Sequence, residues 1–162
     1  MASLEVSSPP LHQAYDAALL DLDGVIYVGR EAVPGVVPVL RDISRTGMTL
    51  TYVTNNASRS SQSVAAHLCE LGLQVLAADV VTSAQAGAAL LATLVPRGSR
   101  VFVLGSRDLM REVDAVGLVS SQDPTAQHFG VIQGYWPDMP WRMLGQAAAV
   151  LAQGVPLSLI HI

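Results

Sequence analysis

The sequence predicts an α/β fold built on a parallel sheet, and three observations support this. Short apolar runs alternate with stretches in which apolar residues recur at helical spacing, as in doubly wound sheets. Hydrophobic residues make up 51% of the 162 residues and charged residues 14%, which favours a packed core over disorder. Polar residues follow two of the apolar runs, as Asp21-Leu22-Asp23-Gly24 and as Thr54-Asn55-Asn56. The carboxyl ends of parallel strands are where such sheets bind ligands.

The first half of the chain is predicted to contain two strand–helix pairs. Pro34 suits the start of the first helix, and Gly47 and Gly72 suit the left-handed residue that follows a helix. The predicted elements are a strand over 16–21, an irregular stretch over 25–32, a helix over 34–46, a strand over 48–53 and a helix over 60–71.

The second half keeps the α/β pattern but loses the acidic strand ends, so we expect a domain boundary near 79–82. Thr82 and Gln85 have the spacing of a capping box ahead of an apolar helix. The predicted elements are a helix over 82–94, a strand over 101–105, a helix over 107–116, a strand over 129–133 and a helix over 139–153.

Charge and hydropathy exclude several classes of protein. The net charge of −4 and the isoelectric point near 5.4 argue against a nucleic-acid partner. No apolar run reaches the roughly 18 residues of a membrane span, and residues 1–13 lack the features of a signal peptide. Cys69 is the only cysteine, so no internal disulfide can form; we expect a cytoplasmic protein with Cys69 in its core.

The two polar strand ends are expected to share one crevice, because consecutive parallel strands are usually neighbours. The hydroxyl of Thr54 and the N–H groups before the next helix suit an anion such as phosphate. Asp21 and Asp23 would repel a bare phosphate, and a divalent cation such as Mg²⁺ removes that objection. The residues therefore predict Mg²⁺-dependent phosphoryl chemistry.

Each motif alone is weak evidence. Asp-x-Asp-Gly is expected by chance in about one chain in twenty of this length. Thr54-Asn55-Asn56 alone is an ordinary turn and helix cap. Asp108 follows a later apolar run, but it lacks a paired aspartate and is interpreted as a residue of a helix start.

The two motifs, in this order and at this spacing, resemble those of the haloacid dehalogenase-like (HAD) superfamily. The stretches 21–27 and 54–60 are more narrowly similar to subclass IIA, the NagD-like and 4-nitrophenylphosphatase group. The stretches 64–72, 79–85 and 112–118 resemble actinobacterial members assigned as glycerol-3-phosphate phosphatases. The resemblance extends over residues 16–156.

This resemblance implies a HAD-like, Rossmann-like parallel-sheet core, of which the chain holds the N-terminal half, and part of an inserted α/β cap. The expected organisation is a flexible leader over 1–15, core over 16–81 and partial cap over 82–162. The implied substrate is a small phosphorylated metabolite, with glycerol 3-phosphate as the first choice and a nucleotide, pyridoxal phosphate or sugar phosphate as alternatives.

The resemblance also implies a role for each site residue. Asp21 would be the nucleophile that forms an aspartyl-phosphate, and Asp23 the acid and then the base. Asp21 and the main-chain carbonyl of Asp23 would hold Mg²⁺. The phosphate-binding residues would be Gly24, which leaves room for the ligand, the Thr54 hydroxyl, the Asn55 N–H and Asn56.

The sequence departs from the family pattern in three respects. It contains no lysine, whereas the third family motif supplies one that pairs with the nucleophile and phosphate. No acidic pair follows Asp138, and residues 157–162 do not match the expected strand and loop. We therefore expect a truncated chain, with a tail at 157–162 that is an artefact, poor folding and little turnover.

Two other functions stay open on these grounds. One is a catalytically inactive remnant or phosphate-binding module that keeps the phosphate site without turnover. The other is a receiver-like domain phosphorylated on aspartate. It fits less well, because receivers do not carry Asp-x-Asp-Gly at the first strand and use a lysine.

Overall fold

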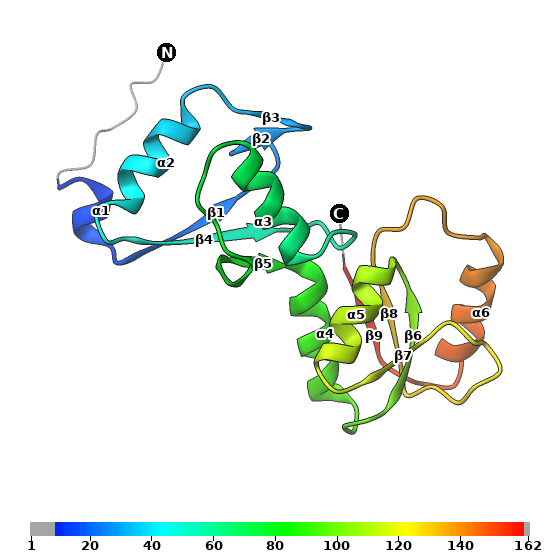
Figure 1. The fold of residues 1–162 in the computed structure, drawn as a ribbon. Coiled ribbons are helices and arrows are strands. Elements are labelled where there is room, and N and C mark those ends of the chain that lie inside the picture. The colour runs from blue at the N-terminus through cyan, green and yellow to red at the C-terminus, as the bar shows by residue number, and fades with distance from the viewer. Residues whose placement is uncertain (1–8, 161–162) are drawn as a thin grey trace, which may run out of the picture. The chain divides into compact units, whose positions relative to one another are not determined.

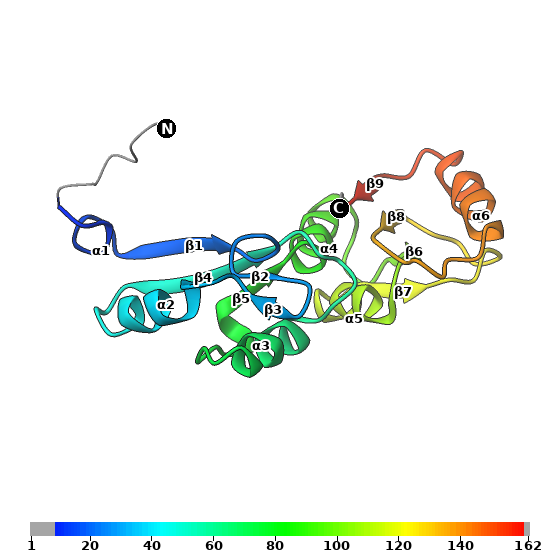
Figure 2. The same ribbon diagram turned by 90° about the horizontal axis from the view of Figure 1, so that it is seen from above.

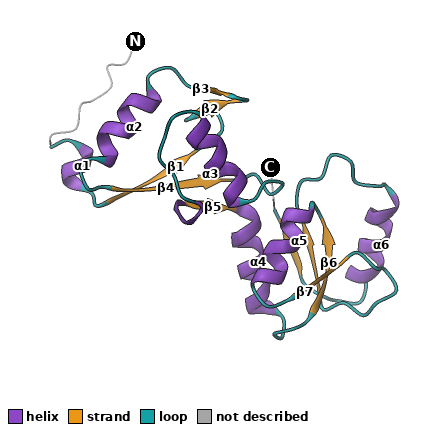
Figure 3. Cartoon of the chain, in the orientation of Figure 1, coloured by secondary structure: helices purple, strands orange, loops and turns teal. Residues whose placement is uncertain are grey.

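The computed structural model describes residues 9–160, which form two compact units (Figure 1). The first unit contains residues 9–54 and 64–80, and the second contains residues 55–63 and 81–160. Helices alternate with strands in both units (Figure 3). The chain passes from one unit to the other at three places, and the first of these follows Thr54 directly.

The sheet of the first unit has the strand order β1-β4-β5, and β1 pairs with β4 in parallel. Ala17 lies opposite Thr49 and Asp21 opposite Val53. The elements of this part of the chain are α1 (Leu11–Ala14), β1 (Ala17–Asp21), β2 (Tyr27–Val28), β3 (Glu31–Ala32), α2 (Val36–Ser44), β4 (Thr49–Thr54), α3 (Ser61–Glu70), the 3₁₀ turn η1 (Ala77–Asp79) and β5 (Val80–Thr82).

Helices α2 and α3 lie on the same side of this sheet (Figure 2). Alternate strand residues, among them Leu20 and Tyr52, pack with both helices in one apolar cluster. The residues between them face the other way, and Leu19 is 76% exposed. One face of the first sheet is therefore packed, and the other is open within the described residues.

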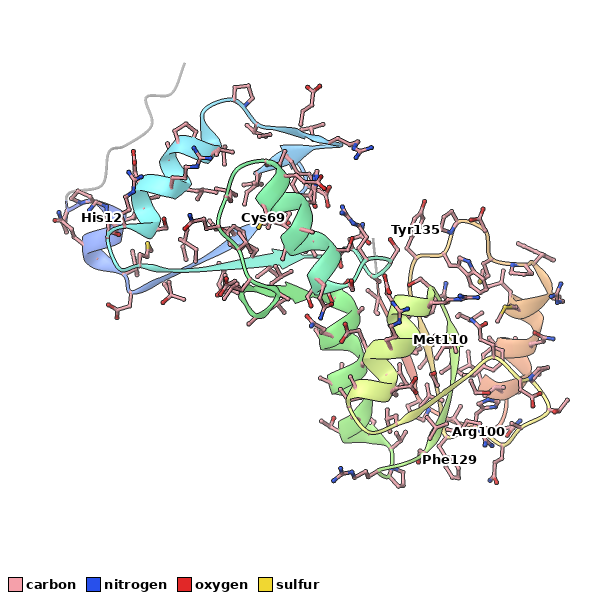
Figure 4. The ribbon with its side chains drawn as sticks, viewed as in Figure 1. His12, Cys69, Arg100, Met110, Phe129 and Tyr135 are labelled. Carbon is pink, nitrogen blue, oxygen red and sulfur yellow. The ribbon has the colours of Figure 1, made fainter. Side chains whose placement is uncertain are left out.

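The second unit has a four-stranded sheet in the order β7-β6-β8-β9, with every pair parallel. Helices α4 and α5 pack on one face and α6 on the other, with a separate apolar cluster on each side. Arg100 and Phe129 lie at one end of the sheet, where the Phe129 N–H donates to the Arg100 carbonyl at 2.9 Å (Figure 4). The elements are α4 (Ser83–Leu94), β6 (Arg100–Leu104), α5 (Arg107–Ala115), β7 (Val119–Ser121), β8 (Gly130–Gln133), α6 (Arg142–Leu151) and β9 (Leu157–Leu159).

The predicted α/β fold with parallel sheets is confirmed, and the differences are local. The stretch predicted to be irregular contains the antiparallel pair β2–β3, closed by a turn in which Gly29 has φ of 62°. Part of the expected leader is helical, as α1, and β9 in the expected tail pairs with β8. Residues 1–8 and 161–162 of those two segments lie outside the described residues.

Cys69 is exposed on α3, so the expectation of a core cysteine is wrong (Figure 4). Its neighbour Leu68 takes the buried position on the helix, and the Cys69 thiol donates to the Val75 carbonyl at 3.4 Å. Among residues 9–160, no helix is long and apolar enough to cross a membrane.

Candidate active site

Strands β1 and β4 end side by side, at Asp21 and Thr54. Because Asp21 lies opposite Val53 in a parallel pair, Thr54 follows at the same edge of the sheet. The Asp21 side chain is exposed, whereas Thr54 is only 2% exposed. This edge therefore holds an exposed carboxylate at the end of β1 and a buried threonine at the end of the neighbouring strand.

The loop after β1 is anchored by Leu22, which is fully buried between two exposed aspartates. The Leu22 N–H donates to Asp21 Oδ1 at 2.9 Å, which orients that carboxylate. The Leu22 carbonyl accepts hydrogen bonds from the N–H groups of residues 25–27, at distances between 2.9 and 3.2 Å. Asp21 and Asp23 are thus carried by a tight turn with a buried anchor.

Gly24 closes this turn with φ of 82°, a conformation that favours glycine. Its N–H donates to the Tyr27 carbonyl at 2.8 Å. A Cβ at Gly24 would meet no atom of the chain within 4 Å, so the backbone angle is what requires glycine here. Close approach of a ligand to Gly24 stays a prediction.

Helix α3 packs against the same turn. The buried rings of Tyr27 and His67 meet edge to face, with centroids 4.8 Å apart and planes at 75°. His67 therefore packs against the residue whose carbonyl holds Gly24.

The remaining predicted phosphate-binding residues, Asn55 and Asn56, belong to the second unit. The Ser83 hydroxyl donates to the Asn55 carbonyl at 2.7 Å. Asn56 Oδ1 accepts from the N–H and the hydroxyl of Ser58, at 2.8 and 2.7 Å, which forms an Asx turn. Ala57 is fully buried in the cluster between α4, α5 and the second sheet. We call residues 55–58 the 55–58 loop.

The structure thus brings Asp21, Asp23, Gly24 and Thr54 together within the first unit. Asn55 and Asn56 follow Thr54 along the chain but are fixed by contacts of the second unit. Sequence reasoning missed Ser83, because a hydrogen bond between residues 28 positions apart leaves no local pattern. The capping box at Thr82 and Gln85 marked the neighbouring residue only.

The donor atoms at the end of β1 suit Mg²⁺, which prefers hard oxygen ligands. Asp21 and Asp23 supply carboxylate and carbonyl oxygens within one turn. Within the described chain no group of three or more His, Cys, Asp or Glu side chains could hold a metal. Mg²⁺ sites commonly use only one or two carboxylates with water and phosphate oxygens, so these two residues fit such a site.

Asp108 has the structural role predicted for it. It lies in the first turn of α5, where Ser106 is the N-cap, and it forms an ion pair with Arg111 at 2.7 Å. Burial, with a further contribution from Asp108, raises the pKa of Glu112 one turn later on the helix.

The comparison with known families decides the relationship. The family of haloacid dehalogenase-like hydrolases matches residues 18–119. The chain belongs to this family. That HAD match includes both strand ends described above, and it confirms the resemblance.

Relatives of known structure place the chain within the NagD-like subclass IIA of the HAD hydrolases. The crystal structure of a glycerol phosphate phosphatase from Mycobacterium tuberculosis in complex with magnesium superposes with a TM-score of 0.88 at 39% identity, over 94% of this chain and 45% of that one. NagD from Escherichia coli superposes with a TM-score of 0.73 at 28% identity, over 85% of this chain and 53% of that one.

Two curated relatives are similar in sequence. D-glycerol 3-phosphate phosphatase of M. tuberculosis is 42% identical over 142 residues, which are 88% of this chain and 39% of that protein. An acid sugar phosphatase of Staphylococcus saprophyticus is 32% identical over 140 residues, 86% of this chain and 53% of that protein. The chain therefore spans about half of the length of these HAD phosphatases, or less.

Proposed function

We propose that this chain carries the nucleophile of a Mg²⁺-dependent phosphatase that hydrolyses a small phosphomonoester. The observation that supports this most is the sheet edge at which β1 ends with the exposed Asp21 and the neighbouring strand β4 ends with Thr54. Glycerol 3-phosphate is the substrate of first choice, because the 42% identical relative is a D-glycerol 3-phosphate phosphatase.

In the proposed reaction an oxygen of the Asp21 carboxylate bonds to phosphorus while the bond from phosphorus to the substrate alkoxide breaks. Asp23 gives its proton to the departing alkoxide. A water molecule then attacks phosphorus and loses a proton to Asp23. The bond from phosphorus to Asp21 breaks, so inorganic phosphate leaves and both side chains return to their starting state.

The remaining residues of the proposed site bind and orient the phosphoryl group. The Thr54 hydroxyl and the N–H groups of Asn55 and Asn56 would donate to phosphoryl oxygens, and Gly24 would let the backbone approach closely. Asp21 and the Asp23 carbonyl would hold Mg²⁺, which supplies positive charge that offsets the charge of the phosphate when it is bound. The turn around Leu22 keeps both aspartates in place for these roles.

Phosphate release from glycerol 3-phosphate by the purified chain tests the proposal. Because the chain lacks the family lysine, we expect slow release, which requires Mg²⁺ and falls to background in Asp21→Asn. Asp16→Asn is the matched control, since Asp16 is also exposed but lies at the opposite end of β1. Equal rates for the wild type and Asp21→Asn would rule out Asp21 as the nucleophile.

A phosphate-binding module without turnover is the second candidate, because these 162 residues contain no lysine to pair with phosphate. Binding of inorganic phosphate measured by NMR separates the two. A chain that binds phosphate at residues 54–56 and releases none from any phosphomonoester is the binding module. Phosphate release together with an acid-stable phosphoryl label on Asp23, and none on Asp21, would contradict both the phosphatase with Asp21 as nucleophile and the binding module.

A further inference from the structure

We propose that Ser83 is a positioning residue for phosphate binding, which acts by fixing the peptide between Asn55 and Asn56. The inference rests on the proposed function, because it takes the Asn56 N–H as a donor to phosphate. Nothing in the sequence pattern of the two motifs points to Ser83.

The hydrogen bond from the Ser83 hydroxyl to the Asn55 carbonyl is short, at 2.7 Å, and joins residues 28 positions apart. Ser83 is the first residue of α4, but it is not the residue that caps the helix. Thr82 Oγ1 accepts from the Gln85 N–H at 3.2 Å, and Gln85 Oε1 accepts from the Thr82 N–H at 3.0 Å. The Ser83 hydroxyl is therefore available to hold the loop.

Fixing the Asn55 carbonyl also fixes the direction of the Asn56 N–H. The peptide group is planar and trans, so its C=O and N–H point in opposite directions. With the Asn55 carbonyl directed to Ser83, the Asn56 N–H is directed away from α4. Because the Asn56 N–H already has its direction before phosphate arrives, it loses less conformational freedom on binding, and this favours affinity.

Two further contacts within the second unit hold the residues that follow Asn55. Ala57 is fully buried, and a Cβ at Gly134 would come within 3.0 Å of the Ala57 Cβ, so glycine there makes room for the loop. The Asn56 side chain is engaged by Ser58 at 2.7 and 2.8 Å. Ser83 is the contact that determines the Asn55 peptide, while Ala57 and Ser58 hold the residues after it.

The test compares four variants by their affinity for inorganic phosphate in the presence of Mg²⁺, followed through the backbone amide signals of Asn55 and Asn56. Ser83→Ala removes the hydroxyl. Ser83→Thr and Ser83→Val form a matched pair of equal shape, of which only threonine keeps the hydroxyl. Thr93→Ala is the control, since the Thr93 hydroxyl donates to the Leu90 carbonyl at the same 2.7 Å on the same helix, away from the loop.

We expect Ser83→Ala and Ser83→Val to weaken phosphate binding roughly 2- to 10-fold, the range that one hydrogen bond supplies. Ser83→Thr and Thr93→Ala should bind as the wild type does. In the absence of phosphate, the Asn56 amide signal should shift in the alanine and valine variants only. The threonine–valine pair keeps the test valid if the alanine variant fails to fold.

Two results would overturn the inference, and they differ in what they say of the proposed function. If the wild type binds phosphate and Ser83→Val binds it equally well, Ser83 has no positioning role and the phosphate site stands. If the wild type shows no phosphate-dependent shift at Asn55 or Asn56, the proposed site fails and the role of Ser83 fails with it.

Discussion

The two sheets of the molecule differ in how their faces are covered. In the first unit α2 and α3 pack on the same face, and the opposite face leaves Leu19 76% exposed. In the second unit helices pack on both faces, and Val101 to Leu104 of β6 are all buried. Strand β1, which contains Leu19, and strand β6 are both apolar runs in the sequence. An apolar run alone therefore does not show how many faces of a strand are covered.

The residues predicted for the site are not all held by the same unit. The aspartates and Thr54 stand on the sheet that is covered on one face. The 55–58 loop is fixed by the unit whose sheet is covered on both faces, through Ser83 and the buried Ala57. The more fully packed unit therefore supplies the contacts that hold Asn55 and Asn56.

The largest expected effect comes from a truncation in the doubly covered sheet. Phe102 is fully buried and packs with the residues of α6, and its ring meets that of His128 at a centroid distance of 5.2 Å. Phe102→Ala should lower the free energy of unfolding by about 3–5 kcal/mol. Urea unfolding followed by tryptophan fluorescence measures this, since Trp136 and Trp141 both lie in the second unit.

Leu19→Ala provides the comparison in the first unit. Leu19 is an apolar strand residue too, but it is mostly exposed, and its truncation should change the free energy of unfolding by less than about 0.5 kcal/mol. Similar losses in Leu19→Ala and Phe102→Ala would mean that the open face of the first sheet is covered in solution.

A smaller effect is expected from the turn that carries the aspartates. Gly24 has φ of 82°, so Gly24→Ala should destabilise the first unit by about 1–2 kcal/mol. Gly145→Ala is the matched substitution in the second unit. Gly145 is an exposed residue within α6, and its replacement by alanine should raise the free energy of unfolding by about 0.5–1 kcal/mol. Hydrogen exchange of amides in β1, β4 and α6 measures both changes in stability. A loss of stability in both variants, or a gain in both, would contradict this prediction.

Local patterns in the sequence were sufficient to predict most of the helices. The capping box at Thr82 and Gln85 is present as expected, because all of its contacts lie within one turn. Strands β2, β3, β5, β7 and β9 were not predicted, since runs of two or three residues are too short to show a periodicity.

Packing between residues far apart in the sequence determines which side chains are exposed, and local patterns do not show this. The exposure of Leu19 depends on which helices cover β1, and the exposure of Cys69 on which side of α3 faces the sheet. The placing of Asp21 beside Thr54 was predictable, because neighbouring parallel strands end at one edge. The bond between Ser83 and Asn55 was not, because it depends on how α4 packs.

The smallest expected effect is a pH dependence confined to the second unit. Burial holds the pKa of the His128 imidazole below its ordinary value of 6.5, and Arg100 lowers it further, while Asp123 acts in the opposite direction. In the unfolded chain the His128 imidazole takes up a proton near pH 6.5, and in the folded chain it does so only at lower pH. The stability of the second unit should therefore be full above pH 6.5 and fall as the pH drops below it.

His128→Leu should flatten this fall, measured as the free energy of unfolding between pH 4.5 and 7 by tryptophan fluorescence, because it removes the group that titrates. Asp123 stays ionised over this range, since hydrogen bonds from Thr125 lower its pKa below the ordinary 3.8. Glu112 contributes with the opposite sign: its raised pKa stabilises the fold at low pH and loses that contribution as the pH rises. Glu112→Gln should therefore steepen the rise in stability with pH. A wild-type slope that survives unchanged in His128→Leu would show that the burial of His128 against Phe102 has no part in the pH dependence.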